Sequence, residues 1–292
     1  MAEIPVDGLF NQFAVLLLLA AVIGFIGTRL KQPLIVSFIA VGIISGPSLL
    51  GWVDGDEPMM QLLAETGIAL LLFIVGLKLD LHLIRTMGPV ALATGLGQVL
   101  FTSGVGFLIA IGLGMDAITA IYVAVALTFS STIIIVKLLS DKKEIDALHG
   151  RIAIGFLIVQ DICVVLAMIL ITSLAVGEGD ANVVMEVGQV ILTGVLMLLF
   201  VALLMRYVLA PVLDVLARTP ELLVLFSIAM AVSMATGGDL LGFSKEVGAF
   251  LAGIAIASTP YREAVASRLT ALRDFLLLFF FISLGAQLDM GT

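Results

Sequence analysis

One acidic side chain lies in the middle of a long apolar segment of this sequence. Asp161 follows Arg151 by ten residues in the run 151–176, and Gln160 directly precedes it. At a rise of 1.5 Å per helical residue, ten residues place the carboxylate about 15 Å deep, near the centre of a bilayer. An ionisable group at that depth costs about 2.5 kcal/mol to more than 10 kcal/mol, so it predicts a functional site.

Asp161 could bind either a cation or a proton. A carboxylate in a partly dry cavity holds its proton more tightly than one in water, so the two ions can compete for the same oxygens. Gln160 adds an amide donor and a carbonyl acceptor at the same depth. The alternative is a structural aspartate that bonds to a neighbouring helix. Competition for one carboxylate is sufficient for exchange, so we expect Asp161 and Gln160 to form an ion-binding site.

A cluster of hydroxyl side chains lies in the preceding apolar run, at the same depth as Asp161. Thr128, Ser130, Ser131 and Thr132 surround Phe129 in the middle of AIYVAVALTFSSTIIIVKLL. Such hydroxyls often bond to the carbonyl four residues earlier in their own helix, which is the structural alternative. Transporters also break helices at mid-membrane, which frees backbone groups to hold ions. The coincidence of depth favours a helix break, with these hydroxyls at the ion site.

Two further charged residues are weaker candidates. Glu65 lies about two turns into its apolar run and fits either helix packing or the ion pathway. Lys137 closes the end of its run, where a cation complements the helix dipole and can reach the interface.

The chain lacks a Walker loop, a GxGxxG motif, an HExxH motif and metal-ligand Cys/His spacing. We therefore expect a carrier or channel that needs no cofactor, and we do not expect an enzyme.

Composition identifies the elements that must hold these residues. Of the 292 residues, 61% are hydrophobic and 12% are charged, about half the charged fraction of a soluble domain. The net charge of −8 does not indicate an acidic soluble protein, because the charges sort by side of the membrane, and no nucleic-acid partner is expected. The single cysteine, Cys163, excludes an internal disulfide. Apolar runs and breakers predict an all-α polytopic membrane protein with ten spans. They are 9–28, 33–50, 59–78, 87–113, 116–139, 151–176, 183–209, 219–237, 243–258 and 272–289.

The charged residues between the ten spans sort onto two sides of the membrane. Of the 14 basic residues, all but Lys245 lie on alternate connections or at the span ends that border them. The opposite connections are acidic, with Asp54, Asp56, Glu57, Asp116, Glu178, Asp180, Glu186, Asp239 and Glu246. Because basic loops stay in the cytoplasm, both ends of the chain are expected outside. Small residues in GFIG, GLGQ and GAFLAG fit close packing between helices.

Five motifs resemble the monovalent cation:proton antiporter-2 family, especially its Kef-type members. They are LLLFIVGLKLD at 70–80, ALTFSSTIIIVKLL at 126–139, GFLIVQDICVV at 155–165, GAFLAGIAIASTPYR at 248–262 and FFFISLGAQLD at 279–289. The resemblance implies an inverted-repeat fold with broken crossing helices and the ion-binding aspartate at Asp161, after Gln160. It also implies a homodimer in a bacterial or archaeal inner membrane. Many members carry a cytoplasmic nucleotide-binding regulatory domain.

Two departures from the family pattern matter. The pattern continues for about three helices beyond the tenth span, so we expect 1–292 to be an incomplete exchanger domain, truncated in the second repeat. Electrogenic relatives have Asn-Asp or Asp-Asp at the site and a lysine inside the tenth helix. Here the pair is Gln160-Asp161, and span 272–289 has only Arg273 near its inner end. These differences predict electroneutral exchange of K⁺ or Na⁺ for H⁺, with Arg273 as a supporting residue.

Two other functions remain open at this stage. A gated potassium efflux channel would pass cations without strict coupling to proton counterflow. A membrane scaffold or sensor without transport would keep its function when the Asp161 charge is removed. The sequence does not distinguish K⁺ from Na⁺, because that selectivity depends on cavity size and on the number of oxygens around the ion.

Overall fold

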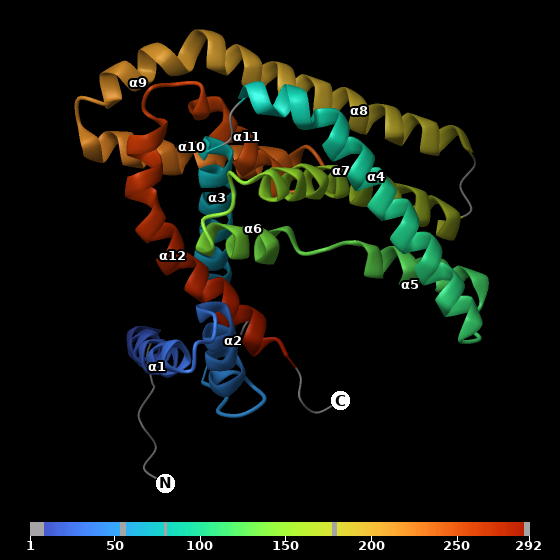
Figure 1. Cartoon of the computed structure of the whole chain (residues 1–292), viewed down its shortest axis with the longest axis horizontal. Helices are drawn as coiled ribbons and strands as arrows, with labels where there is room; N and C mark the ends of the chain where they lie inside the picture. The colour runs from blue at the N-terminus through green and yellow to red at the C-terminus, as the bar shows by residue number, and fades with distance from the viewer. Residues whose placement is uncertain (1–8, 53–56, 79–80, 177–179, 289–292) are drawn as a thin grey trace. The chain divides into compact units, whose positions relative to one another are not determined.

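The computed structural model describes residues 9–52, 57–78, 81–176 and 180–288, and all regular elements within these ranges are helices (Figure 1). Asp54, Asp56 and Glu178, which belong to the acidic connections, lie outside these ranges. The helices form two compact units. The first unit comprises Met1–Ile68 and Leu269–Thr292, and the second comprises Ala69–Arg268.

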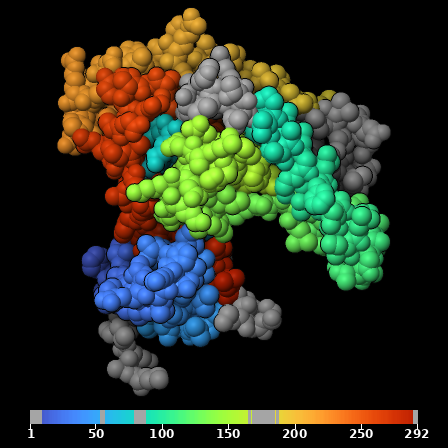
Figure 2. Space-filling view, in the orientation of Figure 1, coloured from blue at the N-terminus to red at the C-terminus, as the bar shows by residue number. Residues whose placement is uncertain are grey.

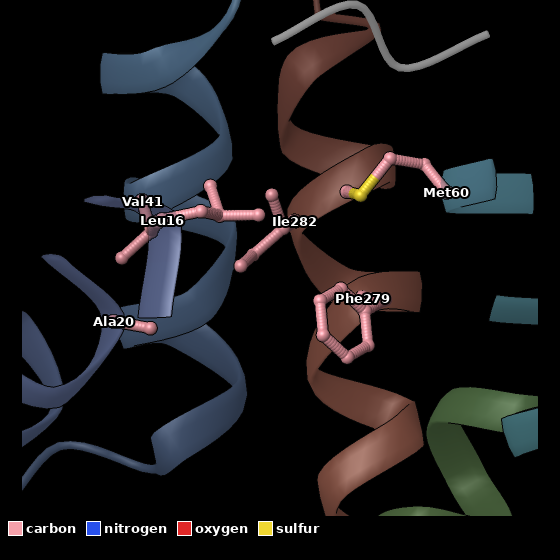
Figure 3. Close-up of a cluster of buried hydrophobic side chains, with 6 residues drawn as sticks. All are labelled: Leu16, Ala20, Val41, Met60, Phe279 and Ile282. Atoms are coloured by element: carbon pink, nitrogen blue, oxygen red, sulfur yellow. The ribbon is translucent and has the colours of Figure 1, made fainter. Parts of the chain in front are cut away.

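The first unit packs α1 (Leu9–Arg29), α2 (Leu34–Ser45) and the start of α3 (Pro58–Lys78) with the end of α12 (Arg262–Ala286). α1 and α2 pack against each other, and Figure 2 shows this part of the chain in blue. A close approach between α2 and α12 is possible because both carry glycine there: a Cβ on Gly42 would meet the Gly285 Cα at 2.8 Å. The core of this unit is apolar (Figure 3) and consists of Leu16, Ala20, Val41, Met60, Phe279 and Ile282.

The second unit contains the remaining helices in chain order. They are α4 (Leu81–Gly112), α5 (Ala117–Thr128), α6 (Thr132–Asp141), α7 (Leu148–Val176), α8 (Asp180–Leu203), the π-helix η1 (Leu204–Leu209), α9 (Ala210–Leu216), α10 (Pro220–Leu240) and α11 (Lys245–Ala257). α4 packs along both α5 and α7, and α10 packs along α11.

Small residues let the helices of the second unit approach closely. A Cβ on Gly155 would meet the Ala91 Cβ at 2.6 Å, and a Cβ on Gly95 would meet Val159 at 2.8 Å, so α4 and α7 cross almost backbone to backbone. The GAFLAG motif of α11 uses Gly248 in the same way against α10. The prediction that these motifs serve helix packing is confirmed for Gly95 and Gly248.

Each of the ten predicted spans overlaps a helix, and the all-α prediction is confirmed. Within the described ranges, seven helical stretches are long and apolar enough to cross a membrane: α1, α3, α4, α5 with α6, α8 through α9, α10 and α12. α2 and α11 have 12 and 13 residues, fewer than the roughly 20 that a bilayer requires. α7 is 29 residues long. Ten crossings therefore remain a prediction.

Several predicted boundaries were wrong. α4 begins at Leu81 instead of residue 87 and passes through the expected breaker RTMGP, with Pro89 inside the helix. α12 begins at Arg262 instead of residue 272, and the seventh segment continues through η1 to Leu216 instead of ending at 209. Apolar runs locate the lipid-facing part of a helix, whereas Arg, Glu, Ala and Leu continue its hydrogen bonding beyond that part.

Candidate ion-binding site

The hydroxyl cluster interrupts the helix that contains it, as the sequence predicts. α5 ends at Thr128 and α6 begins at Thr132, with extended backbone at Phe129 (φ −88°, ψ 123°) and Ser131 (φ −70°, ψ 108°). Figure 1 shows α5 and α6 as separate helical segments joined by extended chain. The Ser131 hydroxyl caps α6 by accepting from the Ile134 N–H at 3.5 Å. The break leaves a carbonyl end of one half-helix and an amide end of the other without helical partners.

Two glutamine side chains satisfy the carbonyl end of α5. The Thr128 carbonyl accepts a hydrogen bond from Gln98 Nε2 at 3.1 Å and another from Gln160 Nε2 at 3.3 Å. Gln98 comes from α4 and Gln160 from α7, so three helices meet at this carbonyl. A buried carbonyl without a partner costs about 1–3 kcal/mol, and these amides remove that cost.

The Thr128 side chain is buried and already engaged. Its hydroxyl donates to the Ala124 carbonyl at 2.7 Å, which is the back-bond that the structural alternative anticipates. It also lies 2.8 Å from the Ser103 hydroxyl on α4. Because the single Thr128 proton is used toward Ala124, Ser103 acts as the donor of this second bond. Thr128 therefore contributes its carbonyl and the closure of α5 to the site, while its hydroxyl holds the helix end.

The amide end of α6 meets the acidic residue. Thr132, the first residue of α6, donates from Oγ1 to Asp161 Oδ1 at 3.4 Å. A helix N-terminus carries about half a positive charge, which stabilises a carboxylate beside it. Asp161 is partly buried, Thr132 is buried, and Ser130 and Ser131 are exposed. The structure thus brings Asp161 and Thr132 together and places Gln160 with Thr128.

Gln160 has one unsatisfied polar atom. Its side chain is 1% exposed, and Nε2 donates to Gln98 Oε1 as well as to the Thr128 carbonyl. Among the described residues, no group donates to Gln160 Oε1, which is buried. A buried oxygen without a hydrogen-bond partner destabilises the folded protein unless a ligand binds to it.

Sequence reasoning missed three residues of this region. Gln98 and Ser103 lie on α4 and contact the end of α5. The signal for Gln98 was available, since it is an amide inside an apolar run, but GLGQ was interpreted only as a packing motif. Glu246 was assigned to an external connection, whereas it lies in the first turn of α11 and acts electrostatically on Asp161.

The weaker candidates have other surroundings. Lys137 forms an ion pair with Asp141 at 2.6 Å, one turn later in α6. Glu65 is exposed on α3, and Arg273 is buried on α12, where it donates to the neighbouring Asp274 at 2.9 Å. Glu65 and Arg273 belong to the first unit, and their roles in the ion pathway remain predictions.

Comparison with known proteins identifies the family. The family model described as the transmembrane sodium/hydrogen exchanger matches residues 14–292. The iron transporter MagA of Paramagnetospirillum magneticum is 33% identical over 95% of this chain and 63% of its own length. The K(+) efflux antiporter 5 of Arabidopsis thaliana is 29% identical over 97% of this chain and 50% of its own length. The Na(+)/H(+)-K(+) antiporter GerN of Bacillus cereus is 29% identical over 96% of this chain and 71% of its own length.

The chain spans between 50% and 71% of the length of these three curated relatives. The family match covers the broken helix pair, the buried glutamine and the acidic residue on α7 in one continuous stretch. With seven apolar helices of membrane-spanning length among the described residues, the chain is an integral multi-pass membrane protein. It belongs to the transmembrane sodium/hydrogen exchanger family of cation/proton antiporters.

Proposed function

We propose that this chain carries the ion site of an antiporter that exchanges K⁺ or Na⁺ for protons at Asp161. The observation that carries the proposal is the carboxylate beside the amide end of a half-helix, with Thr132 Oγ1 3.4 Å from Asp161 Oδ1. Named relatives support the choice of ions, since they include a K(+) efflux antiporter and a Na(+)/H(+)-K(+) antiporter.

The exchange follows from competition at one carboxylate. The α6 dipole stabilises Asp161 in its charged form, whereas partial burial opposes that form. Binding of either a proton or a monovalent cation neutralises the carboxylate, so both loaded forms cross the membrane at lower cost than the empty one. Gln160 and the half-helix ends supply the oxygens and dipoles of the site, as broken helices do in other secondary transporters.

We further propose that the exchange is electroneutral. Gln160 occupies the position where a second acid would add a charge, and the span 272–289 contains no lysine. One proton per cation is the stoichiometry that a single titrating carboxylate gives. A ratio above one in reconstituted protein would contradict this proposal and would direct attention to Glu246, the other acidic group that acts on Asp161.

A monovalent cation suits the surroundings of Asp161 better than iron does. The groups around the break are a carboxylate, hydroxyls, side-chain amides and a backbone carbonyl. Oxygen ligands of this kind suit hard cations, whereas imidazole and thiolate suit iron and its neighbours. The relative named as an iron transporter makes Fe²⁺ a necessary comparison in the assay.

The first prediction concerns Asp161→Asn. We expect cation-driven proton flux in proteoliposomes of the full-length protein with K⁺ or Na⁺, and loss of that flux in Asp161→Asn, because the amide cannot exchange a proton for a cation. Asp239→Asn is the matched control, since Asp239 is an exposed acid on α10, and it should retain the flux.

Each other outcome has a distinct meaning. Flux that survives in Asp161→Asn would make the aspartate structural and remove the proposed mechanism. K⁺ flux without proton counterflow would favour a gated efflux channel. One relative is named as a glutathione-regulated potassium-efflux system protein, which is a reason to test for such a channel. Flux driven by Fe²⁺ but by neither K⁺ nor Na⁺ would replace the proposed substrate.

A further inference from the structure

Gln98 connects the ion site to a helix that contributes no acidic residue to it. From α4, Gln98 donates through Nε2 to the Thr128 carbonyl at 3.1 Å and to Thr102 Oγ1 at 3.2 Å. Its Oε1 accepts from Gln160 Nε2, 62 residues later in the chain. Every hydrogen-bonding atom of the Gln98 side chain is therefore engaged, on three different helical segments.

These bonds determine the orientation of both amides. The Thr128 carbonyl can only accept, so Gln98 must turn its NH₂ group toward it. The Gln98 oxygen then faces Gln160, which must donate to it from its own NH₂ group. With Gln160 Nε2 directed at Gln98 Oε1 and the Thr128 carbonyl, the Gln160 oxygen is turned away from both. This sequence of donors and acceptors settles an O/N assignment that geometry alone leaves open.

The result is a buried oxygen that no donor in the described part of the chain satisfies. Gln160 is 1% exposed, and its Oε1 finds no donor among the described residues. An unsatisfied buried acceptor is destabilising, and coordination of a cation would remove that penalty. Burial and a fixed orientation together make this atom a preformed ligand rather than a mobile side chain.

We propose that Gln98 is a positioning residue that holds Gln160 Oε1 in place as a ligand for the transported cation. This inference rests on the proposed function and assigns to α4 a part in cation affinity. Gln98 acts through Gln160 and the end of α5, while proton binding is left to Asp161. Removing Gln98 should therefore weaken cation binding and leave the turnover of the loaded carrier unchanged.

The fold should tolerate the removal. Ser103 still bonds to Thr128, and the α4–α7 crossing at Gly95 and Gly155 does not involve Gln98. In Gln98→Leu, Gln160 keeps its bond to the Thr128 carbonyl but loses its bond to Gln98. One hydrogen bond instead of two then holds the Gln160 side chain, so its oxygen is less firmly positioned for the cation.

The test compares KM and Vmax for the cation in proteoliposomes of the full-length protein, with K⁺ and Na⁺ measured separately. We expect Gln98→Leu to raise KM about tenfold, a loss of about 1.4 kcal/mol, with Vmax within about twofold of wild type. Gln160→Leu should raise KM at least as much, and the double variant no further, because Gln98 acts through Gln160. Gln189→Leu is the matched control, since Gln189 is exposed on α8, and its KM should stay unchanged.

A second measurement separates this inference from the proposed function. Cation-induced thermal stabilisation of the purified protein reports binding without transport, and its midpoint concentration should shift by the same factor in Gln98→Leu. If the wild type binds cation but shows no proton-coupled flux, the proposal of antiport fails. The shift of the midpoint concentration in Gln98→Leu still tests whether Gln98 supports cation binding. A wild type that shows neither flux nor stabilisation overturns both.

Two results contradict the role of Gln98 alone. A lowered Vmax with unchanged KM would show that Gln98 only supports the fold. Independent, multiplicative effects of Gln98→Leu and Gln160→Leu would show that Gln98 does not act through Gln160.

Discussion

Thr132 is the residue whose hydroxyl contacts Asp161, and its contribution can be measured by an isosteric change. Thr132→Val removes the Oγ1 donor but keeps the shape and the β-branch. The bond is long, at 3.4 Å, so we expect a modest two- to threefold rise in the KM for the cation. Thr132→Ser should retain wild-type values, because it restores the hydroxyl.

The matched control is Thr193→Val on α8, where the hydroxyl bonds to the Gln189 carbonyl of its own helix. It should leave the KM unchanged. An equal effect of Thr132→Val and Thr193→Val would assign both to general helix stability and would remove Thr132 from the ion site.

Single residues were predictable where their polarity conflicted with their surroundings. Asp161 and the 128–132 hydroxyls stand out from long apolar runs, so depth alone identified them. The Gln98–Gln160 pair joins residues 62 positions apart and depends on where α4 crosses α7. A single sequence gives helix positions but not crossing points, and Glu246 was missed for the same reason.

The break between α5 and α6 depends on local capping as well as on tertiary contacts. Replacing Ser130 and Ser131 with alanine removes the α6 cap and introduces the strongest helix former. An N-cap replacement costs about 0.5–2 kcal/mol, and the 3.5 Å distance here suggests the lower end. We expect helix to extend into the break and flux to fall about tenfold or more, with little change in the amount of folded protein.

Ser267→Ala provides the comparison for the double alanine variant. Ser267 is exposed on α12, and its hydroxyl bonds to the Ala264 carbonyl. Its flux should match wild type. Full flux in the Ser130→Ala/Ser131→Ala protein would mean that tertiary contacts at Thr128 hold the break without the cap.

The start of α5 predicts a dependence of stability on pH. Hydrogen bonds from the Thr119 side chain and backbone lower the pKa of the exposed Asp116 carboxyl, which caps the helix. A lowered folded-state pKa gives stability that is complete above the unfolded value of about 3.9 and is lost as pH falls through the folded value. We expect Asp116→Asn, which caps without a charge, to show a shallower decline in Tm below pH 4 than wild type.

The measurement is a Tm series in detergent between pH 6 and pH 3. The effect should be small because the group is exposed to solvent. Identical acid limbs in wild type and Asp116→Asn would show that the carboxylate cap adds nothing in this range.

At the scale of helices, the sequence predicted well which helices exist, but it predicted poorly where they begin and end. All ten predicted segments contain a helix because apolar runs report burial in lipid. The early start of α12 was missed because the polar helix formers at 262–271 carry no hydropathy signal. The early start of α4 was missed because RTMGP was interpreted as a breaker. The seventh segment was expected to end at residue 209, whereas the helical chain continues through η1 to Leu216. Pro211 lies in the first turn of α9, where its missing N–H is tolerated.

For the whole molecule, the question is how many of the helices cross the membrane. The basic residues alternate by side only if every predicted segment spans, α2 and α11 included. At 1.5 Å per residue, the 13 residues of α11 reach about 20 Å, short of the roughly 30 Å hydrocarbon core. A short helix can still connect the two sides when it lies inside the protein and its flanking chain is covered. The charge pattern and the helix length thus make opposing arguments about α11.

Single-cysteine labelling decides between them, because Cys163 is the only native cysteine. In a Cys163→Ala background, a membrane-impermeant maleimide applied from outside should label Met115→Cys and Leu241→Cys, and should label Lys142→Cys and Ser258→Cys only after the membrane is opened. Met115 and Lys142 flank α5 and α6, which together have the length of a full span, so this pair calibrates the assay. Leu241 and Ser258 flank α11. If both report the same side, α11 does not cross. With the other nine predicted segments crossing, the two ends of the chain would then lie on opposite sides of the membrane.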